Sequence, residues 1–208
     1  MQQVTLNYQH TNVHLWLPDA EQVKAAYYES KSRDAGIAFP HWSKLWPSAL
    51  AMASFLDKHA HYIQDKQVVE LAAGLGLPSL VAAAYAKQVH SSDYLPEAVD
   101  VIKQSVQLNH LTNMTCEVLD WNHLPAALRA DVVLLSDINY EPEAFEQLYK
   151  VIAAFIHSGA IILLSTPQRL MARPFIERLL PWCTYQEEAI IETAEGQTFI
   201  STLVLQSG

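Results

Sequence analysis

The stretch Val68–Gly76, VVELAAGLG, constrains the fold more than any other part of the chain. An apolar β-run over Gln67–Leu71 breaks into small residues and is followed by an apolar helical pattern over Leu77–Lys87. Strand, small-residue turn and helix in this order form the ligand site of open α/β sheets. Small residues let the backbone approach a ligand closely, and the helix N-terminus presents free N–H groups. We therefore predict an α/β fold with a ligand at this turn.

The turn differs from the glycine-rich turn that binds a pyrophosphate. Ser79 stands where the third glycine of that fingerprint would be, and Glu70 places a carboxylate at the strand end, four residues before Gly74. A carboxylate at this position disfavours a phosphate. We therefore expect the loop that contains Ala72, Gly74 and Gly76 to hold a ligand with a cationic or amine-bearing group.

Outside this stretch, apolar β-runs alternate with helical patterns, and two further β-runs end the chain with no helix between them. Such alternation predicts parallel strands joined by right-handed crossovers. We therefore predict an α/β fold with a mostly parallel, seven-stranded, Rossmann-like sheet that ends in an antiparallel hairpin. The predicted strands cover residues 67–71, 88–93, 114–119, 131–136, 160–165, 182–191 and 198–205.

The first 60 residues are predicted to extend the same domain. Alternating apolar residues predict a β-hairpin over Val4–Leu17, and Asp19 is a capping residue for a helix over Ala20–Ser30. The segment Phe39–Pro47, FPHWSKLWP, is rigid and aromatic. Because no linker or repeat interrupts the sequence, the prediction is a single domain over 1–208, with an N-terminal extension over 1–60 and a cofactor-binding core over 61–208.

Composition narrows the classes of partner. The net charge is −9 and no Lys/Arg-rich run occurs, which excludes a nucleic-acid backbone as the expected partner. The nine histidines lack metal-ligand spacing, so no metal site is predicted. No apolar run is long enough for a membrane span, and the N-terminus lacks a signal-peptide pattern. Two cysteines without metal spacing, Cys116 and Cys183, favour a reducing, cytoplasmic location. We expect a monomer or a weak dimer.

Polar residues follow four successive predicted strands, where ligands bind in open sheets. Asp93 comes about twenty residues after the turn, where an acid can accept hydrogen bonds from both ribose hydroxyls. Asp120 and Trp121 could read an exocyclic amine and stack on a purine. The ligand is therefore predicted to be a nucleoside with ribose hydroxyls, an amine and no phosphate. The four strand-end groups are Glu70 with its turn, Asp93–Tyr94, Asp120–Trp121 and Ser136–Asp137.

These features resemble class I S-adenosylmethionine-dependent methyltransferases over roughly residues 60–205. The resemblance lies in ELAAGLG, Asp93, the Asp120–Trp121 pair and the terminal hairpin. Within that class, PHWSKLWPSALAMASFL and DVVLLSDINY resemble the lysine methyltransferase-like group, which has a Trp-containing segment before the first strand and an Asp-x-x-Tyr motif after the fourth. Ala72 and Ala73 depart from the glycine-rich family loop, which is tolerable if these residues avoid positive φ.

The resemblance implies S-adenosylmethionine as the cofactor and assigns a role to each site residue. Trp46 would pack beside the cofactor, the loop Glu70–Gly76 would cradle its methionine portion, and Asp93 would hold the ribose. Asp120 and Trp121 would hold the adenine. Asp137 and Tyr140 would line the acceptor site as the catalytic residues. The complete predicted cofactor set is Trp46, Glu70, Ala72, Gly74, Gly76, Asp93, Tyr94, Asp120, Trp121 and Ser136.

Methyl transfer to an amine requires a neutral nitrogen, so a lysine acceptor has to lose its proton first. Asp137 could hold and orient the incoming ammonium, and Tyr140 could narrow the channel or accept a hydrogen bond. An Asp with a pKa of about 4 is a poor base for a lysine with a pKa of about 10. Loss of the proton to water therefore stands beside general-base catalysis by Asp137.

Three interpretations of the function stay open at this point. The first is N-methylation of a protein side chain, with lysine as the expected acceptor. The second is N-methylation of a small molecule, and the third is a non-catalytic cofactor-binding module. A wide acidic rim would suit a protein acceptor, and a closed apolar pocket a metabolite. An NAD-linked dehydrogenase is disfavoured by Ser79 and Glu70.

Overall fold

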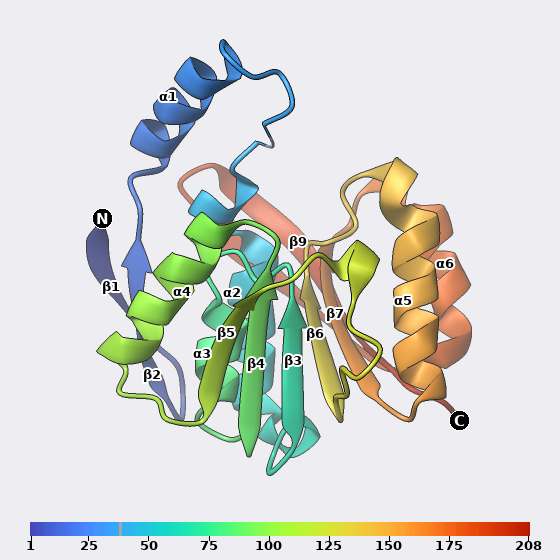
Figure 1. Cartoon of the computed structure of the whole chain (residues 1–208). Coiled ribbons are helices and arrows are strands. Elements are labelled where there is room, and N and C mark those ends of the chain that lie inside the picture. Colours follow the sequence, from blue (N-terminus) through green and yellow to red (C-terminus); the bar gives the residue numbers. More distant parts are fainter. Residues whose placement is uncertain (38) are drawn as a thin grey trace.

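A seven-stranded sheet forms the centre of the molecule. The computed structural model describes residues 1–37 and 39–208. Strand β9 runs antiparallel to both of its neighbours and the other pairings are parallel, which confirms the predicted fold (Figure 1). The sheet order is β5-β4-β3-β6-β7-β9-β8, with β3 Gln67–Leu71, β4 Gln88–Asp93, β5 Met114–Val118, β6 Val132–Ser136, β7 Ile161–Pro167, β8 Cys183–Thr193 and β9 Gly196–Leu205.

Strand β3 lies at the point where the strand order reverses. It pairs with β4 on one side and with β6 on the other, so Glu70 lies opposite Ser91 in one register and Leu134 in the other. The loops that leave the carboxyl ends of β3 and β6 therefore turn away in opposite directions. A crevice opens between such loops, and ligands of open α/β sheets bind there.

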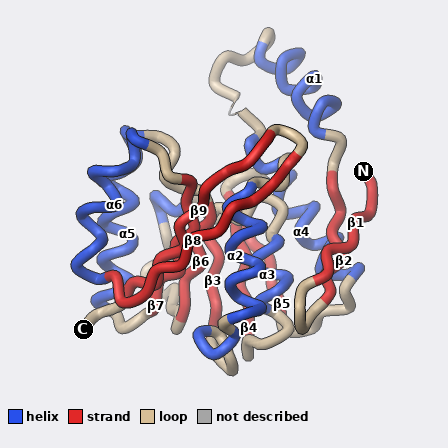
Figure 2. Tube along the Cα trace, turned by 180° about the vertical axis from the view of Figure 1, so that it is seen from behind, coloured by secondary structure: helices blue, strands red, loops and turns tan. Residues whose placement is uncertain are grey.

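The alternation of side chains along the strands produces two cores. Val68 and Leu134 face one core, and Val69 and Leu135 face the other. This is the period of two that a strand imposes, and it lets helices cover both faces of the sheet. Figure 2 shows α2 and α3 against one face. Helices α2 Pro47–Lys58, α3 Leu77–Ala82 and α4 Pro96–Leu108 pack on the first core, and α5 Phe145–His157 and α6 Arg173–Leu179 on the second.

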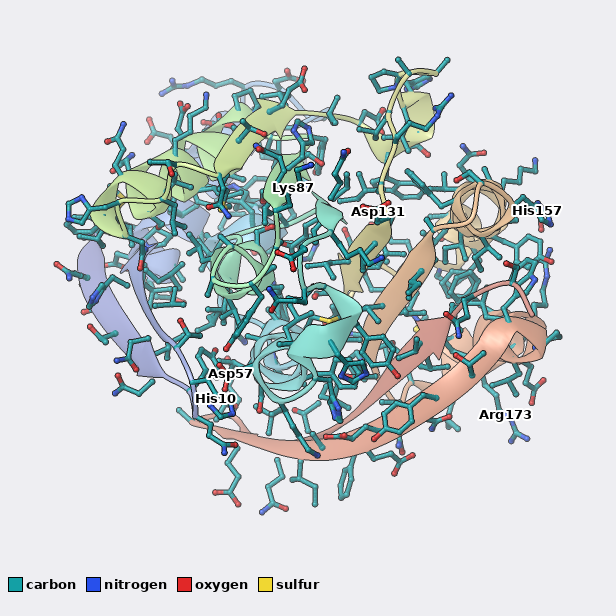
Figure 3. All side chains as sticks on the ribbon, turned by 90° about the horizontal axis from the view of Figure 1, so that it is seen from below. His10, Asp57, Lys87, Asp131, His157 and Arg173 are labelled. Atoms are coloured by element: carbon teal, nitrogen blue, oxygen red, sulfur yellow. The ribbon has the colours of Figure 1, made fainter. Side chains whose placement is uncertain are left out.

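The N-terminal hairpin is attached to the sheet domain by Val13 and Leu15, which belong to the first core, and by polar contacts. Strands β1 Gln2–Asn7 and β2 Asn12–Leu17 pair antiparallel, as predicted. The backbone N–H of His10 donates to Asp57 Oδ2 at 3.1 Å, and the two residues lie side by side in Figure 3. Helix α1 Ala20–Lys31, capped by Asp19, stands away from the sheet (Figure 1).

Some helix boundaries differ from the sequence prediction. The helix expected over 77–87 ends at Ala82, because the N–H groups of Ala84 and Tyr85 bond only three residues back. Short 3₁₀ turns, η4 Pro142–Ala144 and η5 Leu170–Ala172, precede α5 and α6. Within residues 1–37 and 39–208, no helix is both long and apolar enough to cross a membrane.

Candidate active site

A cavity of about 210 Å³ lies at the carboxyl ends of the parallel strands. Figure 3 shows the opposite edge of the sheet, where the parallel strands begin. Lys87 and Asp131, labelled there, directly precede β4 and β6. Five parts of the chain line the cavity: the aromatic segment 39–49, the β3–α3 loop 72–77, residues 93–95 after β4, residues 136–140 after β6, and Arg169 after β7. The cavity therefore lies at the point where the strand order of the sheet reverses.

The loop after β3 has a left-handed backbone at three positions. The φ angles are +53° at Ala72, +56° at Gly74 and +71° at Gly76. A Cβ atom on Gly76 would lie 3.0 Å from Ile102 of α4, so glycine is required there for space as well as for φ. The condition under which alanine would be tolerated, that it avoids positive φ, is not met at Ala72. This conformation costs an alanine about 1–2 kcal/mol, and it persists only where the surrounding structure holds it.

Asp93 joins this loop to the end of β4. Its Oδ2 accepts a hydrogen bond from the Gly74 N–H at 2.9 Å, and its Oδ1 accepts one from the Leu95 N–H at 3.1 Å. Burial raises the pKa of Asp93, and the two N–H donors oppose that shift. Each carboxylate oxygen has two lone pairs, so each retains one for a ligand hydroxyl in the cavity.

Glu70 lies beneath the loop and does not line the cavity. Its side chain is fully buried, and its Oε2 accepts hydrogen bonds from the Ser79 N–H at 3.0 Å and the Ser79 hydroxyl at 2.5 Å. Burial raises the pKa of Glu70 to about 8. Its Oε1 is buried and has no hydrogen-bond partner within the described residues. Glu70 therefore supports the start of α3, and Ser79, at the place of the third glycine, is its partner.

Asp120 is the N-cap of the 3₁₀ turn η3 Trp121–His123 after β5, and Trp121 is the first residue of that turn. Asp120 accepts a hydrogen bond from the Asn122 N–H at 2.8 Å and pairs with His123 Nδ1 at 2.9 Å. Trp121 packs against the second core. Within the described parts of the chain, neither residue lines the cavity. Their assignment to the adenine ring stays a prediction.

The aromatic segment before α2 forms one wall of the cavity. The Trp46 indole N–H donates to the His41 carbonyl at 2.7 Å, which fixes the bend at the helix start. The His41 ring lies 4.7 Å from the Phe39 ring and 5.3 Å from the Tyr140 ring, between ring centroids. Burial lowers the pKa of His41, so this imidazole is neutral at pH 7. We call Phe39, His41, Trp46 and Tyr140 the aromatic wall.

Asp137 and Arg169 form an ion pair on the cavity wall. Arg169 Nη1 donates to Asp137 Oδ1, and Nη2 donates to Oδ2 at 3.1 Å. Asp137 is 9% exposed and has a left-handed φ of +57°. Burial raises the pKa of Asp137, and the Arg169 guanidinium opposes that shift. The carboxylate predicted to meet the acceptor is thus already bound to a cation.

The structure brings most of the predicted site residues together. Glu70, Asp120 and Trp121 are the three predicted residues that lie elsewhere. The cavity also contains residues that the sequence prediction did not assign, namely His41, Lys44 and Arg169. Arg169 follows the fifth parallel strand, but it lies four residues beyond the predicted strand end at Ser165. The predicted residues that line the cavity are Trp46, Ala72, Gly74, Gly76, Asp93, Tyr94, Ser136, Asp137 and Tyr140.

Two observations test whether this cavity fits a bound nucleoside. The Ser136 hydroxyl is buried at the cavity and has no hydrogen-bond partner among the described residues, so a ligand could satisfy it. The Asp93 carboxylate retains one lone pair on each oxygen for the hydroxyls of a ligand.

Among residues 1–37 and 39–208, no group of three or more His, Cys, Asp or Glu side chains could hold a metal ion.

The sequence of the chain is similar to that of known methyltransferases. The sequence profile described as lysine methyltransferase matches residues 13–181. The chain is 34% identical over 143 residues to the human histone-arginine methyltransferase METTL23, covering 65% of this chain and 75% of that protein. It is 31% identical over 140 residues to the Mus musculus protein-lysine methyltransferase METTL21E, covering 61% and 56%. The alignments with the mouse and rat METTL23 proteins span about half of those chains, 44% and 49%.

Solved structures share the fold at low sequence identity. The N-methyltransferase NodS from Bradyrhizobium japonicum, in complex with S-adenosyl-L-homocysteine, has a TM-score of 0.63 at 12% identity and covers 86% of this chain and 98% of that one. The magnesium protoporphyrin IX methyltransferase ChlM from Synechocystis, with bound S-adenosylmethionine, has a TM-score of 0.59 at 16% identity and covers 92% and 99%. At these identities the likeness concerns the fold alone.

Proposed function

The chain belongs to the lysine methyltransferase family, and we propose that it methylates the side-chain nitrogen of a lysine in a protein acceptor. It is an S-adenosylmethionine-dependent methyltransferase. The family profile covers both the aromatic segment and the parallel strands whose ends form the cavity. The proposal therefore concerns the acceptor and the residues that receive it.

In this proposal, three parts of the cavity hold the cofactor. Asp93 accepts hydrogen bonds from the ribose hydroxyls, the backbone of the loop 72–76 follows the methionine portion, and Trp46 packs beside them. When bound, S-adenosylmethionine would supply a methyl group attached to a cationic sulfur. The acceptor lone pair forms the new N–C bond while the S–C bond breaks, and the sulfur leaves as a neutral thioether. The remaining task of the chain is to deliver a neutral nitrogen in the right place.

The observation that carries the lysine proposal is that two tyrosines of the cavity lining reach solvent. Tyr94 and Tyr140 line the cavity and are 43% and 39% exposed, so the cavity is accessible to a side chain on the surface of another protein. Aromatic rings favour the four-carbon stem of a lysine. A partly buried site also disfavours the ammonium form, which helps the acceptor to lose its proton.

Tyr140 has a limited chemical role in this site. Burial raises the pKa of Tyr140 to about 12, so its hydroxyl stays protonated at neutral pH. It can accept a hydrogen bond from the incoming amine or donate one, but it does not serve as the base. The acceptor proton then leaves to water through the open side of the cavity.

An arginine acceptor is the second candidate. It is favoured by the 34% identity to human METTL23, a histone-arginine methyltransferase. A guanidinium keeps its charge at neutral pH and is normally bound by free carboxylates. In this cavity the Asp137 carboxylate is already paired with Arg169, which supports lysine.

The two candidates are separated by a direct transfer assay. The purified chain is incubated with tritium-labelled S-adenosylmethionine and either poly-L-lysine or poly-L-arginine, and acid hydrolysates are analysed for methylated amino acids. We expect label in methyl-lysine. Label in methyl-arginine alone would replace lysine by arginine. Label that appears only in the low-mass fraction of a cell extract would identify a metabolite acceptor.

A further result would support the non-catalytic interpretation. This is calorimetric binding of S-adenosylmethionine together with no transfer to either polymer or to any extract fraction. NAD serves as the control ligand in the same calorimeter, and we expect no heat of binding from it.

We also propose a cytoplasmic location and a monomeric or weakly dimeric state. The support for the location is that Cys116 and Cys183 are both free thiols. Sedimentation of the purified chain over a range of concentrations tests the second statement.

A further inference from the structure

The contact between Arg169 and Asp137 joins the ends of two neighbouring strands. Asp137 follows β6, and Arg169 lies two residues beyond the end of β7. The guanidinium binds the carboxylate through two nitrogens and two oxygens, the bidentate geometry that restricts both side chains most. Both residues line the cavity, and Arg169 is only partly exposed.

The backbone of Asp137 is held from the same neighbouring strand. Its N–H donates to the Ser165 carbonyl of β7 at 2.9 Å. Its left-handed φ of +57° is unfavourable for a residue with a Cβ atom. Such a conformation persists when its surroundings determine it. Here the surroundings are β7 on the backbone side and Arg169 on the side-chain side.

The other charged or ionisable groups near the cavity are Lys44, His41, Asp93 and Glu141, and the Glu141 carboxylate acts electrostatically on His41 and Tyr140. Lys44 Nζ binds Glu195 of the β8–β9 turn at 2.5 Å, and His41 is neutral. Asp93 accepts two backbone N–H bonds and has no ion-pair partner among the described residues, so Asp137 is the cavity carboxylate that a guanidinium neutralises. Without Arg169, Asp137 would be an unpaired carboxylate that binds cations.

We propose that Arg169 is a positioning residue that fixes Asp137 in its left-handed conformation and cancels its charge, so that the cavity receives the methyl acceptor as a neutral amine. This inference rests on the proposed function in one respect, namely that the methyl acceptor is an amine. The charge cancellation itself concerns the cofactor cavity and can be tested without any acceptor.

The test uses the charge difference between the two forms of the cofactor. S-adenosylmethionine carries a cationic sulfur and S-adenosylhomocysteine a neutral one, so the ratio of their dissociation constants reports the charge of the cavity. Calorimetry is done with the full chain and three variants: Arg169→Gln, Asp137→Asn and the double variant. Arg169→Gln leaves a free carboxylate and should favour S-adenosylmethionine by roughly tenfold relative to wild type. Asp137→Asn should shift the ratio by a similar factor in the opposite direction, and the double variant should restore it.

Two further variants separate charge from folding. Arg169→Lys keeps the positive charge without the bidentate geometry, so its ratio should stay near the wild-type value. Arg173→Gln is the matched control, because Arg173 is exposed, pairs with Glu177 at 2.8 Å, and lies at the periphery of the molecule in Figure 3. Its ratio should equal that of wild type.

The outcome that overturns the proposal is a ratio that stays within twofold of wild type in both single variants. An equal loss of affinity for S-adenosylmethionine and S-adenosylhomocysteine would also overturn the proposal, because it would mean that Arg169 only supports the fold. This result is independent of the acceptor. If poly-L-arginine is labelled in the transfer assay and poly-L-lysine is not, the lysine proposal fails while the ratio still reports on Arg169.

Discussion

Ser79 donates both its backbone N–H and its hydroxyl to one oxygen of the buried Glu70 carboxylate. This contact lies beneath the loop that faces the cavity, so the loop and the start of α3 share one buried polar anchor. Ser79, which replaces the third glycine of a pyrophosphate-binding turn, is therefore the structural partner of Glu70.

Replacing Ser79 by Ala should destabilise the fold. The hydroxyl is fully buried, and its loss leaves Glu70 Oε2 with one donor instead of two. We expect a loss of about 1–3 kcal/mol in the free energy of unfolding, measured by urea titration. Ser207→Ala, at an exposed position, is the control and should change nothing. An unchanged urea midpoint in Ser79→Ala would show that the anchor contributes no stability.

Glu70 should make stability depend on pH. Burial raises its pKa from 4.5 to about 8, so the native state holds a proton that the unfolded state releases. This stabilisation is fully present below pH 4.5 and is lost as pH rises toward 8, at roughly 1.4 kcal/mol per pH unit. Glu70→Gln keeps an oxygen acceptor for Ser79 and has no titrating proton. Urea unfolding at pH 5, 6, 7 and 8 should give a flatter profile for the variant, and parallel profiles would contradict the assignment.

The two glycines of the loop should differ in their tolerance of alanine. Both have positive φ, but a Cβ on Gly76 would lie 3.0 Å from Ile102, whereas one on Gly74 would lie 3.6 Å from the Trp42 backbone. Gly74→Ala should therefore cost about 1–2 kcal/mol of stability for the backbone alone. Gly76→Ala should cost about 1–3 kcal/mol more because of overpacking. Thermal unfolding of both variants compares them, and equal losses would show that the Ile102 contact adds no cost at Gly76.

The expectation that polar residues directly after parallel strands face the ligand, which we call the strand-end rule, predicted the position of Asp93 and Asp137. It holds because a parallel sheet brings the carboxyl ends of its strands to one edge. It failed for Glu70, the fourth residue of the five-residue β3, whose side chain points into the buried side of the sheet toward Ser79. The direction of a side chain near a strand end depends on the residue at which the strand stops. That stop is set by the neighbouring strands.

Arg169 was missed for a related reason. The apolar run predicts a strand that ends at Ser165, but β7 continues to Pro167 because Thr166 and Pro167 pair with Ser201 and Ile200 of β9. The partner strand lies more than thirty residues away in the sequence, so this extension is invisible to local patterns. Fold class follows from alternation and periodicity, whereas the wall of the cavity depends on such distant pairings.

Asp93→Ala should weaken cofactor binding. The variant loses the acceptors for the ribose hydroxyls and the contacts with the Gly74 and Leu95 N–H groups. Hydrogen bonds to a charged group are worth about 1.5–3 kcal/mol, so we expect a roughly ten- to hundredfold rise in the dissociation constant of S-adenosylmethionine. The control is Asp100→Ala on the exposed side of α4, where the side chain pairs only with Lys103 among the described residues. Unaltered calorimetric affinity in Asp93→Ala would refute the ribose assignment.

Tyr140→Phe should separate methyl transfer from cofactor binding. Tyr140 lines the cavity, and its hydroxyl stays protonated at neutral pH because burial raises the pKa of Tyr140 to about 12. Its removal keeps the ring in the aromatic wall and deletes one hydrogen bond to the acceptor. With poly-L-lysine as acceptor we expect kcat to fall roughly tenfold while the dissociation constant of S-adenosylmethionine stays the same. Tyr28→Phe, on the exposed side of α1, is the matched control. A fall in affinity without a fall in kcat would move Tyr140 from the acceptor side of the cavity to the cofactor side.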